Sequence, residues 1–223
     1  MQIDMGGKKI LDKSERFAQE NRTLLDEHGV YMVGLLASPG AGKTSTIKAT
    51  IEALRDTYNI AIIEGDIASN VDAVRIKEMG IPAVQINTGG SCHLEGDMVN
   101  KALKVLDLAN TDLIIIENVG NLVCPTDFYL GEDTKVMILS VPEGDDKPLK
   151  YPGIFQAAKA IILNKVDTLP VFDFDVPAFE ERISNLNPQA PLFKIAATKH
   201  DGVAEWTEWL AQQIDAAQTK ARG

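Results

Sequence analysis

The sequence predicts an α/β fold, in which a mostly parallel seven-stranded sheet carries helices on both faces. Short runs of β-branched and apolar residues alternate along the 223-residue chain with longer segments of helical periodicity, which is typical of βα units. Several runs, such as residues 113–116, are continuously apolar, as expected of strands that helices cover on both sides. A chain of this length buries enough surface to fold without disulfides.

The predicted elements follow one another without a repeat, a low-complexity segment or a long linker. Seven segments are predicted to be strands: residues 30–36, 60–64, 83–87, 113–117, 136–141, 160–163 and 192–196. Six segments are predicted to be helices: residues 9–28, 43–57, 71–79, 94–108, 176–185 and 203–217. We therefore expect one domain over residues 1–223, with an N-terminal helix at about 9–28.

The charge balance limits the classes of partner. Lys and Arg number 22 and Asp and Glu number 32, so the formal net charge is −10. An acidic chain is a poor general ligand for nucleic acid or for anionic lipid, since both need clustered cations. No apolar run approaches the roughly 18 residues that cross a bilayer, and the first ten residues do not resemble a secretory signal. The sequence predicts a cytoplasmic protein with no nucleic-acid or membrane partner.

The strongest motif is a glycine-rich loop between the first predicted strand and the next helix. Residues 37–44 read ASPGAGKT, a P-loop pattern in which Ala37 stands where the strict form has glycine. Glycines let the backbone curl around phosphate oxygens, and the helix start adds a favourable field. The fold is therefore predicted to be that of a P-loop NTPase, with a catalytic role for Lys43 at the phosphates. The predicted nucleotide-binding residues of this loop are Gly40, Ala41, Gly42, Lys43, Thr44 and Ser45.

A second motif follows the sixth predicted strand. Asn164, Lys165 and Asp167 form an N-K-x-D sequence, which resembles the base-reading motif of GTPases. A carboxylate at Asp167 accepts from both N1–H and the 2-amino group of guanine, whereas adenine offers neither donor. Each such hydrogen bond to a charged group contributes about 1.5–3 kcal/mol. The pattern predicts GTP or GDP as the nucleotide, although a strand-end turn with a capping Asp is the alternative.

Two acids end predicted strands close to the loop. Glu117 closes the apolar strand 113–117, and Asp66 follows the strand 60–64. Carboxylates in this position orient Mg²⁺ or the attacking water, and the hydroxyl of Thr44 is the third predicted Mg²⁺ ligand. We assign Asp66 and Glu117 catalytic roles, with Asp66 favoured as the partner of the water. Either acid could instead cap a following helix.

The two cysteines of the chain lie in loops that should emerge at the same edge. Cys92 and His93 are adjacent, and Cys124 follows the strand that ends at Glu117. Thiolates and an imidazole favour Ni²⁺ or Zn²⁺ over Mg²⁺. Cys92 also precedes a predicted helix, whose dipole should favour the thiolate. Against a metal site, the spacing matches no standard zinc signature and an isolated cysteine is usually a small buried hydrophobe.

Taken together, the segments EGDIASNVDAVRI, QINTGGSCHL, IIIENVGNLVCP, SVPEGDDKPLKYP and NKVD resemble the hydrogenase nickel-incorporation GTPases, the HypB family. The resemblance runs from about residue 21 to residue 210. It implies a GTP-hydrolysing metallochaperone that assists nickel insertion into [NiFe]-hydrogenase. It also implies a homodimer linked by nucleotide and metal, with Cys92, His93 and Cys124 holding Ni²⁺ or Zn²⁺ at the subunit interface. The implied partners are a HypA-type nickel accessory protein and the hydrogenase large subunit.

Some members of this family carry an N-terminal cysteine-rich nickel motif or a histidine-rich tract. In this chain, residues 1–29 contain no cysteine, and their one histidine is His28. N-terminal nickel-storage sites are therefore not expected. Two other functions stay open: a nickel GTPase that serves another client such as urease, and a zinc-stabilised scaffold in which nucleotide only holds the dimer. Lys147 and Lys150 are candidates for contact with the nucleotide or a second subunit, with a solvated charge run as the alternative.

Overall fold

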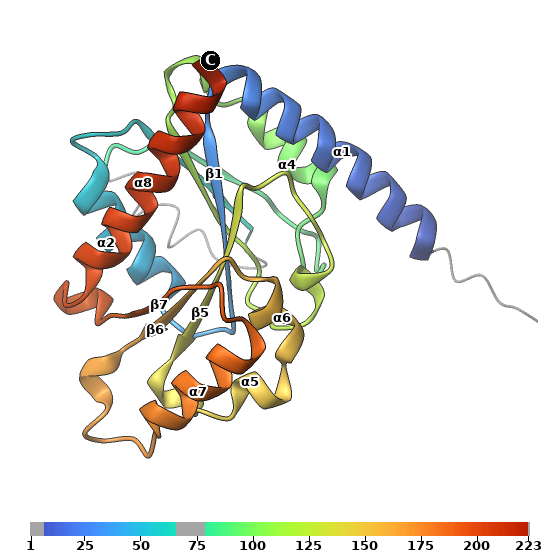
Figure 1. Ribbon diagram of the computed structural model, residues 1–223. Coiled ribbons are helices and arrows are strands. Elements are labelled where there is room, and N and C mark those ends of the chain that lie inside the picture. The colour runs from blue at the N-terminus through green and yellow to red at the C-terminus, as the bar shows by residue number, and fades with distance from the viewer. Residues whose placement is uncertain (1–6, 66–78, 223) are drawn as a thin grey trace, which may run out of the picture.

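A sheet of seven parallel strands runs through the centre of the molecule (Figure 1). The computed structural model describes residues 7–65 and 79–222. The strand order is β3-β2-β4-β1-β5-β6-β7, and every neighbouring pair is parallel. The strands are β1 (Tyr31–Ala37), β2 (Ile60–Glu64), β3 (Ala83–Gln85), β4 (Leu113–Glu117), β5 (Thr134–Ser140), β6 (Ala160–Asn164) and β7 (Leu192–Lys194).

Helices cover both faces of this sheet, as the sequence predicts. On one face lie α2 (Lys43–Leu54) and α8 (Val203–Arg222). The opposite face carries α1 (Gly7–His28), α4 (Gly96–Leu103), α6 (Pro152–Ala157) and α7 (Val176–Leu186), with the short α5 (Lys147–Lys150) beside α7. Figure 1 shows α2 and α8 on the left of the sheet and α1 and α4 on the right.

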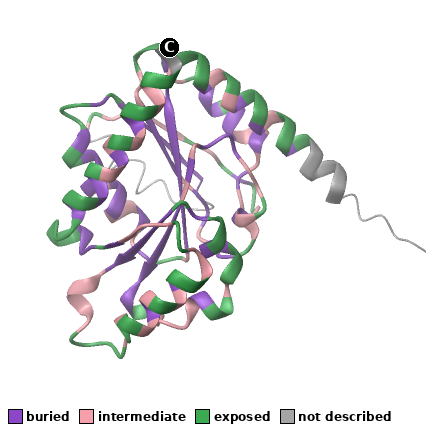
Figure 2. Ribbon diagram, in the orientation of Figure 1, coloured by how far each residue is buried: buried purple, intermediate pink, exposed green. Residues whose placement is uncertain are grey.

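The alternation of side chains along β1 explains the two layers. All seven residues of β1 are buried, and Val33 and Leu35 pack with Ile47 of α2 and Trp206 of α8. Met32 faces the other way and packs with Leu25 of α1. Figure 2 shows the strands buried and the outer sides of the helices exposed. A strand covered on both faces needs apolar residues at every position, which is why the strand segments lack polar alternation.

The predicted elements agree with the structure apart from their ends and two omissions. The predicted helix 94–108 is shorter than expected, since α4 begins at Gly96 and ends at Leu103. The helix α8 runs five residues beyond the predicted end. The sequence did not predict α5 and α6, because helices of 4 and 6 residues are too short for an apolar stripe to repeat. The predicted helix 71–79 lies outside the described residues except for Met79.

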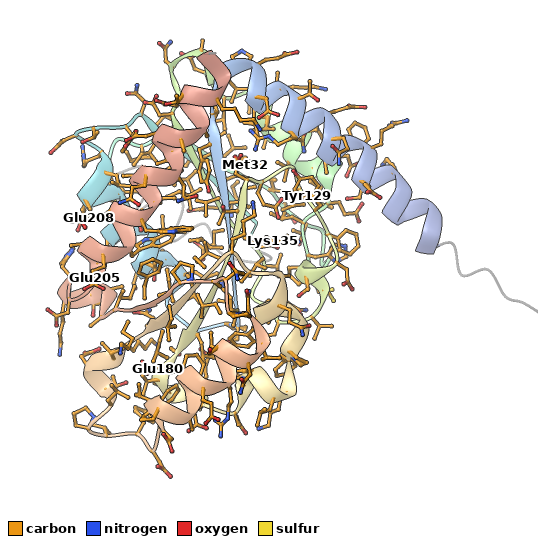
Figure 3. All side chains as sticks on the ribbon, viewed as in Figure 1. Met32, Tyr129, Lys135, Glu180, Glu205 and Glu208 are labelled. Carbon is orange, nitrogen blue, oxygen red and sulfur yellow. The ribbon has the colours of Figure 1, made fainter. Side chains whose placement is uncertain are left out.

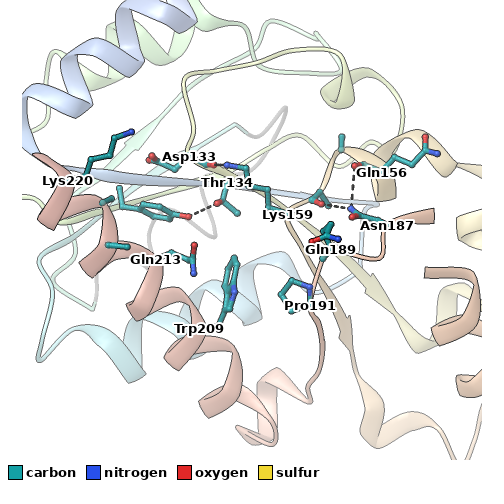
Figure 4. Close-up of a pocket in the computed structure, with 16 residues that line it drawn as sticks. Asp133, Thr134, Gln156, Lys159, Asn187, Gln189, Pro191, Trp209, Gln213 and Lys220 are labelled. Atoms are coloured by element: carbon teal, nitrogen blue, oxygen red, sulfur yellow. Dashed lines mark hydrogen bonds between the residues drawn. The ribbon is translucent and has the colours of Figure 1, made fainter. Parts of the chain in front are cut away.

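A cavity of about 640 Å³ opens at the sheet edge where β1 and β5 begin (Figure 4). Tyr31 and Thr134 share a hydrogen bond of 2.5 Å there, and burial raises the pKa of Tyr31 to about 12. Trp209 and Lys159 line the same space. The cavity lies at the opposite edge from the predicted nucleotide loop, which follows the end of β1.

No helix in the described ranges is long and apolar enough to cross a membrane.

Candidate functional site

The glycine-rich loop leaves the end of β1 and enters α2. Ala37 is the last residue of β1 and has no positive φ, so alanine suits this position. Gly40 and Gly42 have φ of 78° and 96°, in the region that favours glycine. Gly42 precedes α2, and its carbonyl accepts from the backbone N–H and the hydroxyl of Thr46, both at 2.9 Å. The loop therefore presents the N-terminus of α2 at the carboxyl edge of the sheet.

Residues of the N-K-x-D motif hold this loop in place. The side-chain amide of Asn164 donates to the carbonyl of Ala41 at 2.9 Å, and Lys165 donates to the carbonyl of Gly40 at 2.7 Å. A Cβ on Gly42 would lie 2.3 Å from the amide nitrogen of Asn164, so this position excludes any side chain. The structure thus brings the two predicted motifs into contact, and Asn164 and Lys165 pack on the loop backbone.

Asp167 lies in the turn after β6, where its carboxylate pairs with Lys199 at 2.9 Å. The left-handed conformation of Lys165, with φ of 60°, turns the chain between the strand and Asp167. Lys199 belongs to the loop after β7, which the side chain of Asn164 also reaches through a 3.2 Å bond from the N–H of Ala197. Two loops therefore flank the predicted guanine-reading carboxylate.

The donor set beside the loop suits a hard cation. The hydroxyl of Thr44 donates to the carboxylate of Glu117, with oxygens 3.2 and 3.5 Å away. Hydroxyl and carboxylate oxygens are the ligands that Mg²⁺ prefers. Lys43 lies in the first turn of α2 and reaches the carbonyl of Ser38 at 3.4 Å. The predicted water-orienting acid, Asp66, lies outside the described residues, directly after the described end of the β2 segment.

Cys92, His93 and Cys124 come together as the sequence predicts. The two sulfurs are 2.9 Å apart, the Cys92 sulfur lies 3.6 Å from Nδ1 of His93, and the ligand atoms of all three residues lie within 4.8 Å of one another. The imidazole stacks on the ring of Phe128, with centroids 3.7 Å apart. Two soft sulfurs and one imidazole at this spacing form a donor set for Ni²⁺ or Zn²⁺.

The surroundings shift the proton equilibria of two of these ligands. Burial lowers the pKa of His93, although Glu95, 3.8 Å away, opposes the shift. The hydrogen bond with Cys92 raises the pKa of the Cys124 thiol. We predicted that the dipole of a helix next to Cys92 favours its thiolate. That prediction is wrong, because α4 begins at Gly96 and not directly after Cys92. The imidazole is thus favoured in its neutral, metal-binding form.

The segment that leads to Cys124 packs on the glycine-rich loop. A Cβ on Gly120 would lie 3.0–3.2 Å from atoms of Pro39, so only glycine allows this close approach without a shift. Asn121 then accepts from the N–H groups of Val123 and Cys124 at 2.8 and 3.2 Å. Only residues 121–123 therefore separate Cys124 from the glycine that packs on the glycine-rich loop.

Sequence reasoning missed the residue that supports the loop from the side of β5. Glu143 accepts from the backbone N–H and hydroxyl of Ser140, each at 2.7 Å, and its other oxygen accepts from the hydroxyl of Ser38. The S-x-x-E spacing of a capping box was the available signal. Lys147 lies over the ring of Tyr151 and Lys150 pairs with Asp146; contact of either lysine with a nucleotide or a second subunit stays a prediction.

The parallel sheet, the glycine-rich loop before α2 and the Thr44–Glu117 contact define a P-loop nucleotide-binding protein. The nucleotide-binding domain model of the CobW/HypB/UreG family matches residues 31–194. The hydrogenase maturation factor HypB of Azotobacter vinelandii is 47% identical over 221 residues, covering 96% of this chain and 73% of the relative. The probable HypB of Methanocaldococcus jannaschii is 38% identical over 207 residues, which cover 93% of this chain and 94% of the relative.

Solved structures agree with these relatives. The crystal structure of HypB from Helicobacter pylori in complex with nickel has a TM-score of 0.87 and 37% identity, covering 92% of this chain and 96% of that chain. HypB from Archaeoglobus fulgidus has a TM-score of 0.86 at 37% identity, covering 92% and 100%. The chain belongs to the CobW/HypB/UreG family and, within it, to the HypB hydrogenase maturation factors.

Proposed function

We propose that this protein hydrolyses GTP and uses the nucleotide cycle to deliver nickel during maturation of [NiFe]-hydrogenase. The observation that carries the proposal is the Cys92, His93 and Cys124 cluster, which lies at the same sheet edge as the glycine-rich loop and is joined to it through Gly120. A site for a soft metal next to a site for a triphosphate suits a protein that moves metal ions in response to hydrolysis.

In this proposal the chain's own residues bind and orient the triphosphate. Lys43 neutralises phosphate charge, and the backbone around Gly40 and Gly42 follows the phosphate oxygens. Asp167 accepts from guanine, and Asn164 and Lys165 keep the loop in position. Thr44 and Glu117 hold Mg²⁺, which supplies charge neutralisation when it is bound. Asp66 orients the attacking water.

Nickel is the cargo, held by two thiolates and a neutral imidazole. Three ligands per chain leave open coordination positions, which suits release to a second protein better than permanent storage. The Sγ–Sγ distance of 2.9 Å is short enough for one ion to contact both sulfurs. Zn²⁺ uses the same donor types, so the physiological metal has to be measured.

We further propose a homodimer whose association depends on the nucleotide. A twofold axis close to Cys124 would let two chains contribute to one metal site or to an adjacent pair. Linkage then requires metal and nucleotide to change each other's affinity by the same factor, typically about 5- to 150-fold. The proposed partners are a HypA-type accessory protein, which exchanges nickel, and the large subunit of the hydrogenase.

Two measurements test this function: the first is the rate of phosphate release from GTP, and the second is the affinity for nickel in each nucleotide state. Nickel is titrated against the GDP-loaded chain and against the chain with a non-hydrolysable GTP analogue, while sedimentation reports the mass. We expect different nickel affinities and a larger mass with the analogue. Superimposable isotherms with an unchanged mass would overturn the switch, and GTP binding without any hydrolysis would favour the scaffold.

A second client has one specific observation in its favour. A relative from Helicobacter hepaticus, 39% identical over 92% of this chain and 86% of its own, is named a hydrogenase/urease maturation factor. Delivery to urease is therefore the alternative function. Nickel transfer from this chain to each apoenzyme, measured side by side, separates the two clients.

A further inference from the structure

We propose that Lys135 is a positioning residue for the metal cluster, because its ammonium fixes the segment that carries both Cys124 and Phe128. The inference rests on the proposed metal site and adds a residue that touches none of the three ligands. Lys135 lies on β5 next to Gly34 of β1, on the face of the sheet that α1 and α4 cover. Figure 3 labels it close to Tyr129.

The ammonium of Lys135 meets three carbonyl groups of a single turn. Its nitrogen lies 3.0 Å from the oxygens of Thr126 and Phe128 and 3.4 Å from that of Pro125. A lysine ammonium has three donors and no acceptor, so these contacts use its full capacity. Hydrogen bonds from a charged donor are roughly twice as strong as neutral ones. One partly buried side chain therefore binds the backbone of residues 125–128 at three points.

This turn carries two parts of the metal cluster. Cys124 begins the short 3-10 helix Cys124–Thr126, whose last carbonyls have no partner within so short a helix and accept from Lys135. Phe128 offers its carbonyl to Lys135 and its ring to His93, at 24° between the planes. The same ammonium thus positions Cys124 through the backbone of the turn that follows it, and His93 through the stacked ring of Phe128.

The charge of Lys135 is balanced inside the protein. The carboxylate of Glu132 lies 3.7 Å away, and the exposed fractions of the two side chains are 14% and 3%. The N–H of Leu130 donates to the second oxygen of Glu132 at 2.7 Å. Removing Lys135 alone would leave a buried carboxylate without its cation, which destabilises for a reason unrelated to the metal. The test therefore removes both charges.

The experiment compares the variant Glu132→Gln with the double variant Glu132→Gln/Lys135→Met in the full chain. Both lack the buried carboxylate, and only the second lacks the three bonds to the turn. Lys159→Met is the matched lysine control, since Lys159 donates to the carbonyl of Asp133 at 2.6 Å, outside the turn. Each protein is titrated with Ni²⁺ in competition with a chelator, its sulfur-to-nickel charge-transfer absorption is recorded, and its GDP affinity is measured.

We expect the double variant to bind Ni²⁺ about 10- to 100-fold more weakly than Glu132→Gln, the usual effect of removing a group that orients metal ligands. Its charge-transfer bands should shift, while its GDP affinity and that of Lys159→Met stay at the wild-type value. Wild-type nickel affinity and spectrum in the double variant would overturn the proposal. So would an equal loss of nickel and GDP affinity, which is the result of general destabilisation.

Two further variants complete the test. If the double variant does not fold, Lys135→Arg replaces it, because a planar guanidinium keeps the charge but does not match three carbonyls around one nitrogen. Unchanged nickel affinity in Lys135→Arg then overturns the proposal. Cys124→Ser separates the two levels of inference: nickel binding that survives it rejects the metal site itself, whereas its loss beside intact binding in the Lys135 variants rejects only the role of Lys135.

Discussion

The glycine-rich loop and the cluster of Cys92, His93 and Cys124 lie at the same edge of one sheet but are built in different ways. The loop is a single run of eight residues that curls through positive φ angles at Gly40 and Gly42, with Asn164 and Lys165 packed on its backbone from outside. The cluster joins residues 32 positions apart, and its shape follows from Lys135, Phe128 and Asn121. A site made by local backbone conformation should tolerate changes elsewhere in the fold, whereas a site made by side-chain contacts should not.

The largest expected effect concerns Asp167, the carboxylate proposed to bind guanine beside the glycine-rich loop. Asp167→Asn should weaken GTP binding by about 10²- to 10⁴-fold, because the amide no longer accepts from two donors of guanine. Xanthosine triphosphate should bind better, since the amide donates to its 2-oxo group. Competition binding with GTP and xanthosine triphosphate measures this change in nucleotide preference. Lys199→Ala is the control, because it removes the ion pair of Asp167 but keeps the carboxylate; wild-type preference in Asp167→Asn would reject the assignment.

The next effect concerns the phosphates. Lys43→Ala should lower the rate of GTP hydrolysis by about 10²- to 10³-fold, because a fixed positive charge no longer stabilises the transferring group. Nickel binding should be retained, since Lys43 lies in the first turn of α2 and the proposed nickel ligands are Cys92, His93 and Cys124. Lys48→Ala, in the same helix, is the control and should keep its rate. Turnover of Lys43→Ala at the wild-type rate would remove the P-loop assignment.

The dependence of nickel affinity on pH tests the cluster by itself. Each thiol must lose its proton to bind, so affinity should fall by about tenfold per pH unit for each proton released. The raised pKa of Cys124 extends this dependence to higher pH, whereas the lowered pKa of His93 delays competition by the imidazole until more acidic pH. Nickel isotherms from pH 8 to pH 5 measure the slope. GDP affinity should change little over this range; a flat nickel profile would contradict thiolate ligation.

The smallest effect tests the support of the loop by a neighbouring strand. Glu143→Ala removes the acceptor for Ser38 and Ser140 and should lower the free energy of unfolding by about 1–2 kcal/mol. GTP affinity should fall only about 3- to 10-fold, because the glycines still determine the loop. Urea unfolding and nucleotide titration measure the two changes. Glu180→Ala, which breaks an exposed pair with Lys194, is the control and should alter neither; a loss of GTP affinity as large as that of Asp167→Asn would show that the loop is not determined locally.

Most helices and strands, and the glycine-rich loop, could be predicted from the sequence alone. Continuous apolar segments such as residues 113–116 predicted buried parallel strands, and the carboxyl ends of parallel strands meet at one edge. This rule predicts that Cys92 and Cys124 lie at the edge of the sheet that also carries the P-loop. The glycines at positions 40 and 42 predicted a curled loop because glycine, which has no Cβ, adopts positive φ without a steric penalty.

The side chains that support the two sites could be identified only from the packing of the folded chain. Nothing in the periodicity of residues 134–140 marks Lys135, since an isolated lysine in an apolar strand reads the same whether it faces solvent or a turn of carbonyls. Phe128 and Asn121 lie in a segment without helix or strand periodicity, so their contacts with His93 and Cys124 left no pattern to read. Local conformation depends on neighbours along the chain and can therefore be predicted from the sequence. Contacts between distant residues depend on how the whole chain packs, which sequence patterns do not show.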